Sequence, residues 1–227
     1  MSAGESEMAG YFDRQIKLMG EEALKGIRSK KVAIIGSGGL GCSLGIALAG
    51  SGVGELHLVD FDTVSLSNIH RQIAFKMEDI EKPKCKVLGE LLLARSEEGL
   101  KILSFEESLQ EYASRGLEVD LIMDATDNLP SRAEIDKLAK ERRIPWVYAS
   151  VEEWHGQVCF MDKADFSAFR VSDRKPGGIA TPIVMNIASL SANMALRFLA
   201  GLEVKRDCLH YCTLNEGYLK VFHYKMA

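Results

Sequence analysis

A glycine-rich hexapeptide, GSGGLG at residues 36–41, follows an apolar run and opens a helix of small residues. In such an arrangement Gly36 permits a tight turn, Gly38 lets the backbone approach a phosphate, and Gly41 lets the helix pack closely on its strand. The positive end of the helix then faces the anion. We therefore predict a nucleotide-binding loop that consists of Gly36, Gly38, Gly39, Leu40 and Gly41.

An aspartate and two cations follow the next strand. Asp60 ends that strand, where a carboxylate can accept hydrogen bonds from ribose hydroxyls. The segments DFDTVSLSNIHRQ (60–72) and KPKCK (82–86) come next. A dehydrogenase needs no cation here, whereas an adenylyltransferase must neutralise a triphosphate whose charge grows as pyrophosphate leaves. We therefore expect these segments to bind the nucleotide through Asp62, Asn68, Arg71, Gln72 and Lys84, with Arg71 and Lys84 acting on the phosphates.

The pentapeptide DATDN at residues 124–128 is expected at the carboxyl end of a buried strand, where open α/β sheets place their ligands. An aspartate there can hold a magnesium ion together with nucleotide phosphates. We assign that role to Asp127, with Asp124 as the second choice and Asn128 beside it. In a compatible alternative, Asp127 or Asn128 caps the helix expected to start near Ser131.

The elements that must position these residues alternate between strand and helix. Strands are expected at 31–35, 55–60, 101–105, 119–125 and 145–150, and helices at about 40–51, 84–96 and 131–142. Crossovers of helix length predict a doubly wound, mostly parallel sheet. An N-terminal helical segment, about 1–28, precedes it, and we expect one domain over residues 1–227.

The last third of the chain changes character. Residues 155–162 alternate like an antiparallel strand, 163–180 are expected to form a polar, glycine-rich loop, and 208–224 a hairpin. Thr181 and Pro182 resemble an N-cap followed by proline at the first helical position, and Gly201 suits the far end of that helix. The residues between them are apolar nearly all round, which predicts burial in the core or at a subunit contact.

Together the motifs YFDRQ, GSGGLG, DFDTVSLSN-x-x-RQ, KPK and DATDN resemble the MoeB/ThiF family of adenylating enzymes, over residues 11–201. The resemblance implies that ATP and the Gly-Gly tail of a ubiquitin-like sulfur-carrier protein react to give an acyl adenylate and pyrophosphate. It further implies that Asp60 holds ribose, Asn68, Arg71 and Lys84 hold phosphates, and Asp127 holds magnesium. Arg14 of YFDRQ would reach into the site of a neighbouring subunit, because family members are usually dimers.

The chain departs from the family in two respects. Many members carry zinc on two Cys-x-x-Cys pairs, whereas here Cys208 and Cys212 form a lone Cys-x-x-x-Cys pair, so no zinc site is expected. Some members carry a cysteine in the loop before the last helix, and RVSDRKPGGIATP has none. Cys159 lies in an apolar run and is expected to be a buried, unreactive thiol. The predicted chemistry therefore ends at adenylation.

Composition limits the possible classes of partner. A formal net charge of −4, with 26% charged residues, gives no support for nucleic acid or a membrane surface as partner. The first ten residues have no apolar core like that of a signal peptide, and we expect a cytoplasmic protein. A ThiS-like carrier is favoured, followed by a MoaD-like one. Alternatives are a tRNA threonylcarbamoyladenosine dehydratase, a non-catalytic scaffold for a ubiquitin-fold partner, and a nicotinamide dehydrogenase.

Overall fold

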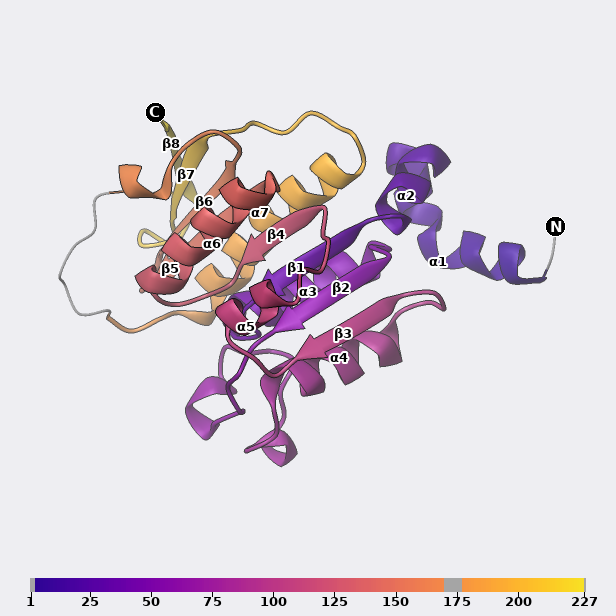
Figure 1. Cartoon of the computed structure of the whole chain (residues 1–227), viewed down its shortest axis with the longest axis horizontal. Helices are drawn as coiled ribbons and strands as arrows, with labels where there is room; N and C mark the ends of the chain where they lie inside the picture. The colour runs from indigo at the N-terminus through magenta and orange to yellow at the C-terminus, as the bar shows by residue number, and fades with distance from the viewer. Residues whose placement is uncertain (1–2, 170–176, 227) are drawn as a thin grey trace.

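The computed structural model describes residues 3–169 and 177–226, and within these the side chains from residue 10 onward. The described residues form one eight-stranded sheet in the order β3-β2-β1-β4-β5-β6-β7-β8 (Figure 1). The strands are β1 (Lys31–Ile35), β2 (Glu55–Val59), β3 (Lys101–Phe105), β4 (Leu121–Asp124), β5 (Trp146–Glu152), β6 (His155–Met161), β7 (Cys208–Thr213) and β8 (Lys220–Lys225).

Pairing within the sheet is parallel from β3 to β5 and antiparallel from β5 to β8. The predicted doubly wound, mostly parallel sheet with antiparallel additions is therefore confirmed. The chain leaves β1 toward β2 on one side and later returns to β4 on the other. The carboxyl ends of β1 and β4 thus form the switch point at which such sheets bind ligands.

Helices cover both faces of the sheet. They are α1 (Ala3–Met19), α2 (Glu21–Arg28), α3 (Gly39–Gly50), α4 (Lys84–Arg95), α5 (Leu109–Ser114), α6 (Leu129–Arg142) and α7 (Thr181–Leu199), with short 3-10 turns η1 (Leu66–Asn68), η2 (Met77–Asp79) and η3 (Phe166–Ala168). One buried cluster joins α3, α4 and α7 to the sheet, and a second joins α5 and α6 to the opposite face. The helices α1 and α2 lie at the end of the sheet where the parallel strands begin (Figure 1).

Most of the predicted elements are present within a few residues of the expected bounds. The short helix α5 and the three 3-10 turns were not predicted, because they are shorter than the periodicity that reveals a helix in a sequence. The N-cap prediction for Thr181 is wrong. The cap is Ala180, and the Thr181 hydroxyl instead donates to the His70 carbonyl at 2.8 Å. Gly201 has the left-handed φ of 70° expected just beyond a helix.

The helix α7 is long and apolar enough, by length and composition, to cross a membrane, and within the described residues no other helix is. Half of that stretch is buried in the fold, where α7 packs on α3, β5 and β6. The prediction of burial therefore holds for one face of the helix. On its other face Met185 is 46% exposed.

Candidate active site

The loop between β1 and α3 requires glycine at two of its positions. Gly36 has φ 99°, and a Cβ there would lie 2.6 Å from the carbonyl oxygen of Ala125. A Cβ on Gly41 would lie 2.1 Å from the carbonyl oxygen of Gly36. A Cβ on Gly38 would meet only the Gln72 amide, at 3.5 Å. The backbone geometry therefore requires glycine at positions 36 and 41, because any side chain there would collide with main-chain atoms. The space beside Gly38 is open enough for a ligand.

The amino terminus of α3 presents its first-turn N–H groups without a side-chain cap. Gly38 is the N-cap residue, no side chain accepts a hydrogen bond there, and the first turn contains no acidic residue. Gly39 packs against α7, since its Cβ would lie 2.8 Å from Val184 Cγ1, and Leu40 is buried in the core. First-turn N–H groups that no side chain of the described residues caps, at the positive end of a 12-residue helix, suit an anion such as a phosphate.

Asp60 ties the end of β2 to this loop. One carboxylate oxygen accepts a hydrogen bond from Ser37 N at 2.5 Å, and the other accepts from Asp62 N at 2.8 Å. Burial raises the pKa of Asp60, and these two hydrogen bonds and Lys84 oppose that rise. Each carboxylate oxygen keeps a second lone pair that can accept a further hydrogen bond, as ribose binding would require. Ribose binding by Asp60 itself remains a prediction. The bond to Ser37 is a role that the sequence did not reveal.

Lys84 is held in place by the second acidic residue of the β2–α4 segment. The lysine is 7% exposed, and its Nζ lies 2.7 Å from Asp62 Oδ2. Its backbone N also donates to the Asp62 carbonyl at 3.0 Å. A buried ammonium group requires such a partner. Asp62, predicted to bind nucleotide, therefore positions a cation near Asp60.

The residues after η1 bring Arg71 and Gln72 against Gly39 and Gly38 of the glycine-rich loop, and Asn68 ends η1 three residues before Arg71. Asn68 Oδ1 accepts a hydrogen bond from Ser65 N at 3.2 Å, which leaves its amide N–H groups to donate elsewhere. Arg71 Nη1 donates to the Ser67 carbonyl at 3.0 Å. Gln72 is 5% exposed, and its Oε1 is buried with no partner in the described part of the chain.

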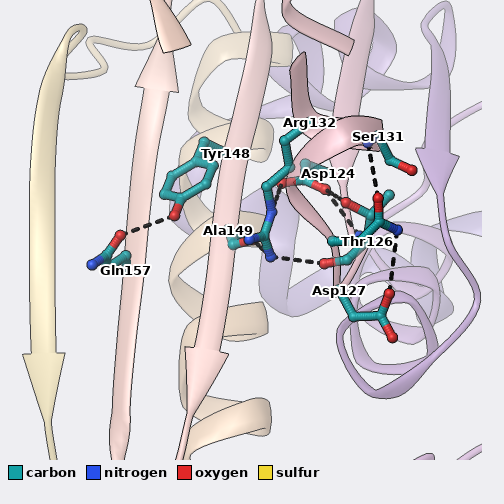
Figure 2. A network of polar contacts seen from close by, with 9 residues as sticks. Asp124, Thr126, Asp127, Ser131, Arg132, Tyr148, Ala149 and Gln157 are labelled. Carbon is teal, nitrogen blue, oxygen red and sulfur yellow. Dashed lines mark hydrogen bonds and ion pairs between the residues drawn. The ribbon is translucent and has the colours of Figure 1, made fainter. Parts of the chain in front are cut away.

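The loop after β4 separates the roles of its two aspartates (Figure 2). Asp124 is fully buried, accepts hydrogen bonds from Thr126 N and Oγ1 at 2.9 and 2.7 Å, and pairs with Arg132 Nε at 3.2 Å. Arg132 also donates to the Thr126 carbonyl at 2.9 Å. The carboxylate oxygens of Asp124 are buried and already paired with Thr126 and Arg132, which argues against Asp124 as a metal ligand.

Asp127 is exposed at the carboxyl edge of the sheet, and Asn128 caps α6. The Asn128 side chain accepts a hydrogen bond from Ser131 N at 2.9 Å, and its amide lies 3.4 Å from Asp127 Oδ1. Of the two residues considered as caps, Asn128 therefore has that role. The Asp127 carboxylate keeps lone pairs for a cation.

Arg14 lies apart from these residues within one chain. It is exposed on α1, and its neighbour Gln15 donates to the Ser51 carbonyl, just beyond the carboxyl end of α3. The glycine-rich loop lies at the other end of α3, and a helix of 12 residues is about 18 Å long. Arg14 therefore lies about one length of α3 from the glycine-rich loop of its own chain.

The five cysteines are all free and buried. Burial raises the pKa of Cys159 to about 12, and Cys208 and Cys212 lie on β7 as predicted. Within residues 10–169 and 177–226, no group of three or more His, Cys, Asp or Glu side chains is arranged to hold a metal ion. Residues 170–176 of the predicted loop lie outside the described residues. A magnesium ion at Asp127 would take its other ligands from phosphate oxygens and water.

The ThiF family model matches residues 12–225. The sulfur carrier protein ThiS adenylyltransferase of Escherichia coli is 31% identical over 85% of this chain and 82% of its own length. The molybdopterin-synthase adenylyltransferase of Escherichia coli is 34% identical over 87% of this chain and 84% of its own length. The adenylyltransferase and sulfurtransferase MOCS3 of Caenorhabditis briggsae is 30% identical, and the chain spans about half (52%) of its length.

Solved structures share the fold at low sequence identity. PaaA superposes with a TM-score of 0.83 at 22% identity, covering 100% of this chain and 75% of PaaA. MccB of Escherichia coli, solved with ATP, superposes with a TM-score of 0.80 at 19% identity, covering 91% of this chain and 66% of MccB. These likenesses establish the fold.

Proposed function

The chain belongs to the ThiF family and is by that membership an adenylyltransferase, and we propose that it uses ATP to adenylate the C-terminal carboxylate of a ubiquitin-like sulfur-carrier protein. The observation that carries this proposal is the uncapped amino terminus of α3 at the glycine-rich loop, beside the buried cation Lys84. Such a site suits a nucleoside triphosphate, because it offers N–H donors and positive charge to phosphates.

The reaction needs little from the protein beyond positioning and charge. A carboxylate oxygen of the carrier attacks the α-phosphorus of ATP, and the bond to the bridging oxygen breaks to release pyrophosphate. Negative charge grows on that oxygen, where Arg71 and Lys84 stabilise it, and Asn68 donates a hydrogen bond to a phosphate. No side-chain nucleophile takes part, which agrees with the burial of all five cysteines.

The remaining site residues contact the ribose and the metal. We propose that the ribose hydroxyls donate hydrogen bonds to the second lone pairs of the Asp60 carboxylate. The Gln72 amide, which lies against Gly38, would contact the nucleotide from the other side of the glycine-rich loop. Asp127 would hold a magnesium ion together with the phosphates, and the ion would neutralise part of the triphosphate charge. The exposed carboxylate next to a capped helix fits one protein ligand of such an ion.

We further propose that residues 1–227 form one adenylating domain that acts in the cytoplasm as a homodimer. In the dimer, Arg14 of each copy would reach the partner's phosphates. The location of Arg14 on α1, about the length of α3 from its own glycine-rich loop, supports this arrangement.

A ThiS-like carrier is our first choice of substrate and a MoaD-like carrier the second. Relatives of both kinds match at similar identity, 31% and 34%, so identity does not separate them. The lone Cys208 and Cys212 pair, in place of two Cys-x-x-Cys pairs, favours the first.

Carrier-dependent exchange of labelled pyrophosphate into ATP tests the proposal. Purified ThiS-like and MoaD-like carriers are offered separately with magnesium, to wild type and to Arg71→Ala, Lys84→Ala and Asp127→Asn. Exchange with one carrier names the substrate, and we expect each variant to lose at least about a hundredfold. Lys86→Ala is the matched control, because Lys86 lies two residues from Lys84 but pairs with Glu106 at the surface. Wild type that binds ATP but exchanges with neither carrier would refute the proposed function.

A further inference from the structure

The guanidinium group of Arg132 lies over an aromatic ring. Its carbon is 5.5 Å from the centroid of the Tyr148 ring, within the range of a cation–π contact. The N–H groups at the edge of the same guanidinium donate to the Asp124 carboxylate and to the carbonyls of Thr126 and Ala149. Figure 2 shows Arg132 between Tyr148 and the loop after β4. The edge of the guanidinium thus holds the loop, and the ring of Tyr148 limits where that edge can move.

Tyr148 is itself fixed from several sides. It is 4% exposed on β5, and its hydroxyl donates to Gln157 Oε1 on β6 at 2.9 Å. Burial raises the pKa of Tyr148, so the hydroxyl keeps its proton as a donor at neutral pH. The ring centroid lies 5.9 Å from that of Phe166 and 4.5 Å from that of Phe169. A buried ring with a bonded hydroxyl and aromatic neighbours is a rigid support for the cation over it.

The contacts of Arg132 determine the position of the backbone next to Asp127. Arg132 Nη2 donates to the Thr126 carbonyl at 2.9 Å, and that carbonyl belongs to the peptide bond that leads to Asp127. The side chain of Asp127 has a weaker contact, 3.4 Å from its Oδ1 to the Asn128 amide. The direction of the Asp127 carboxylate therefore depends mainly on the loop backbone, and through that backbone on Arg132.

The ring of Tyr148 reduces the freedom of a long side chain. A free arginine side chain populates many rotamers, and a ring packed against the guanidinium removes most of them. Leucine in place of Tyr148 would keep an apolar side chain beside Arg132 but leave room at the guanidinium. Arg132 could then shift by about 1 Å and keep Asp124 as its partner, because the attraction between two charges falls only slowly with distance. A shift of that size near a reacting group can cost about a hundredfold in rate.

We propose that Tyr148 is a positioning residue of the nucleotide site. Its ring fixes Arg132, and Arg132 fixes the loop in the conformation that directs Asp127 at a magnesium ion bound to ATP. This inference rests on the proposed function and deepens it, because it names the support of the metal-binding carboxylate. Tyr148 acts here through Arg132, so its replacement should weaken the use of magnesium more than the binding of ATP without the metal.

The affinity for ATP with magnesium and with a chelator, measured by equilibrium dialysis, tests the role of Tyr148. Direct partners of metal ligands are worth about 10–100-fold, and Tyr148 lies one step further away, so we expect Tyr148→Leu to reduce the gain in affinity from magnesium by at least about fivefold. The affinity without magnesium should stay within about twofold of wild type, and Tyr148→Phe, which keeps the ring, should retain most of the gain. Tyr112→Leu is the matched control, because Tyr112 is also a buried tyrosine (2% exposed) with a bonded hydroxyl but lies on α5 against His57. An equal loss in both leucine variants, or no loss in Tyr148→Leu, would overturn the inference.

A double-variant cycle tests whether Tyr148 acts through Arg132. Arg132→Lys keeps a cation beside Asp124 but loses the planar fork, so it should by itself reduce the gain in ATP affinity from magnesium. Adding Tyr148→Leu to Arg132→Lys should then change that gain by less than about twofold, whereas independent effects would multiply and contradict the inference.

The exchange assay separates this inference from the proposed function. If wild type binds ATP more tightly with magnesium but exchanges no pyrophosphate with either carrier, the proposed function is refuted, and the comparison of Tyr148→Leu with wild type still decides the inference. If wild type exchanges pyrophosphate but its affinity for ATP is indifferent to magnesium, adenylation stands and the role of Tyr148 is refuted.

Discussion

The ion pair between Asp124 and Arg132 provides a demanding test of how the loop after β4 is held. Asp124 is fully buried, and Arg132 is its cationic partner at 3.2 Å. Arg132 also donates to the carbonyls of Thr126 and Ala149 at 2.9 and 3.3 Å. Replacing Arg132 with Met keeps much of the volume but leaves Asp124 charged and buried without a counter-ion.

We expect Arg132→Met to lower the free energy of unfolding by about 3–5 kcal/mol at pH 7, the usual cost of breaking a buried pair. Burial raises the pKa of Asp124, and Arg132 opposes this rise. Without Arg132 the folded-state pKa rises further above the unfolded value of about 3.9. The folded variant then holds a proton that the unfolded chain releases, so its deficit is small near pH 4 and grows as pH rises, by up to about 1.4 kcal/mol per unit.

Urea denaturation from pH 4 to 8, for wild type and variant, measures this deficit. The double variant Asp124→Asn/Arg132→Met removes the charge, so it should recover most of the stability and lose the part of the pH dependence that Asp124 causes. Because Arg132 holds the loop that carries Asp127, a displacement of about 1 Å should also slow adenylation about a hundredfold. A deficit below about 1 kcal/mol, or one that the double variant does not reduce, would refute this account.

Three further predictions concern the loop, a buried histidine and the thiols. Gly41→Ala should abolish ATP binding in equilibrium dialysis, because its Cβ would lie 2.1 Å from the Gly36 carbonyl oxygen, whereas Gly50→Ala on the same helix, with no atom within 4 Å, should bind as wild type does. Burial lowers the pKa of His57 below its unfolded value, so the unfolded chain binds the extra proton and stability falls as pH drops below about 6.5. His57→Gln should flatten that decline in urea midpoints, and an unchanged slope would contradict this assignment. Native protein should resist iodoacetamide at every cysteine, as the raised pKa of Cys159 indicates, and unfolded protein should react at all five; rapid native labelling would show that the burial is wrong.

The sequence determined the order of most strands and helices along the chain and the location of the glycine-rich loop. Gly36 and Gly41 could be assigned because a strand-to-helix turn has local steric demands, and these are independent of the rest of the chain. Asp60 and Lys84 could be predicted to lie near the glycine-rich loop because the carboxyl ends of parallel strands meet at one edge. The adenylation chemistry was predicted from the resemblance to the ThiF family, and the match of the family model over residues 12–225 confirms that resemblance.

Only the tertiary structure decided which polar side chains form ion pairs or hydrogen bonds with one another. Asp124 and Asp127 look alike in DATDN, and only the fold shows that one is buried against Arg132 while the other is exposed. Nothing in the sequence pairs Asp62 with Lys84 across 22 residues. Such pairings depend on distances between separate elements, which packing sets, and the energetic cost of an unpaired buried charge then selects the partner.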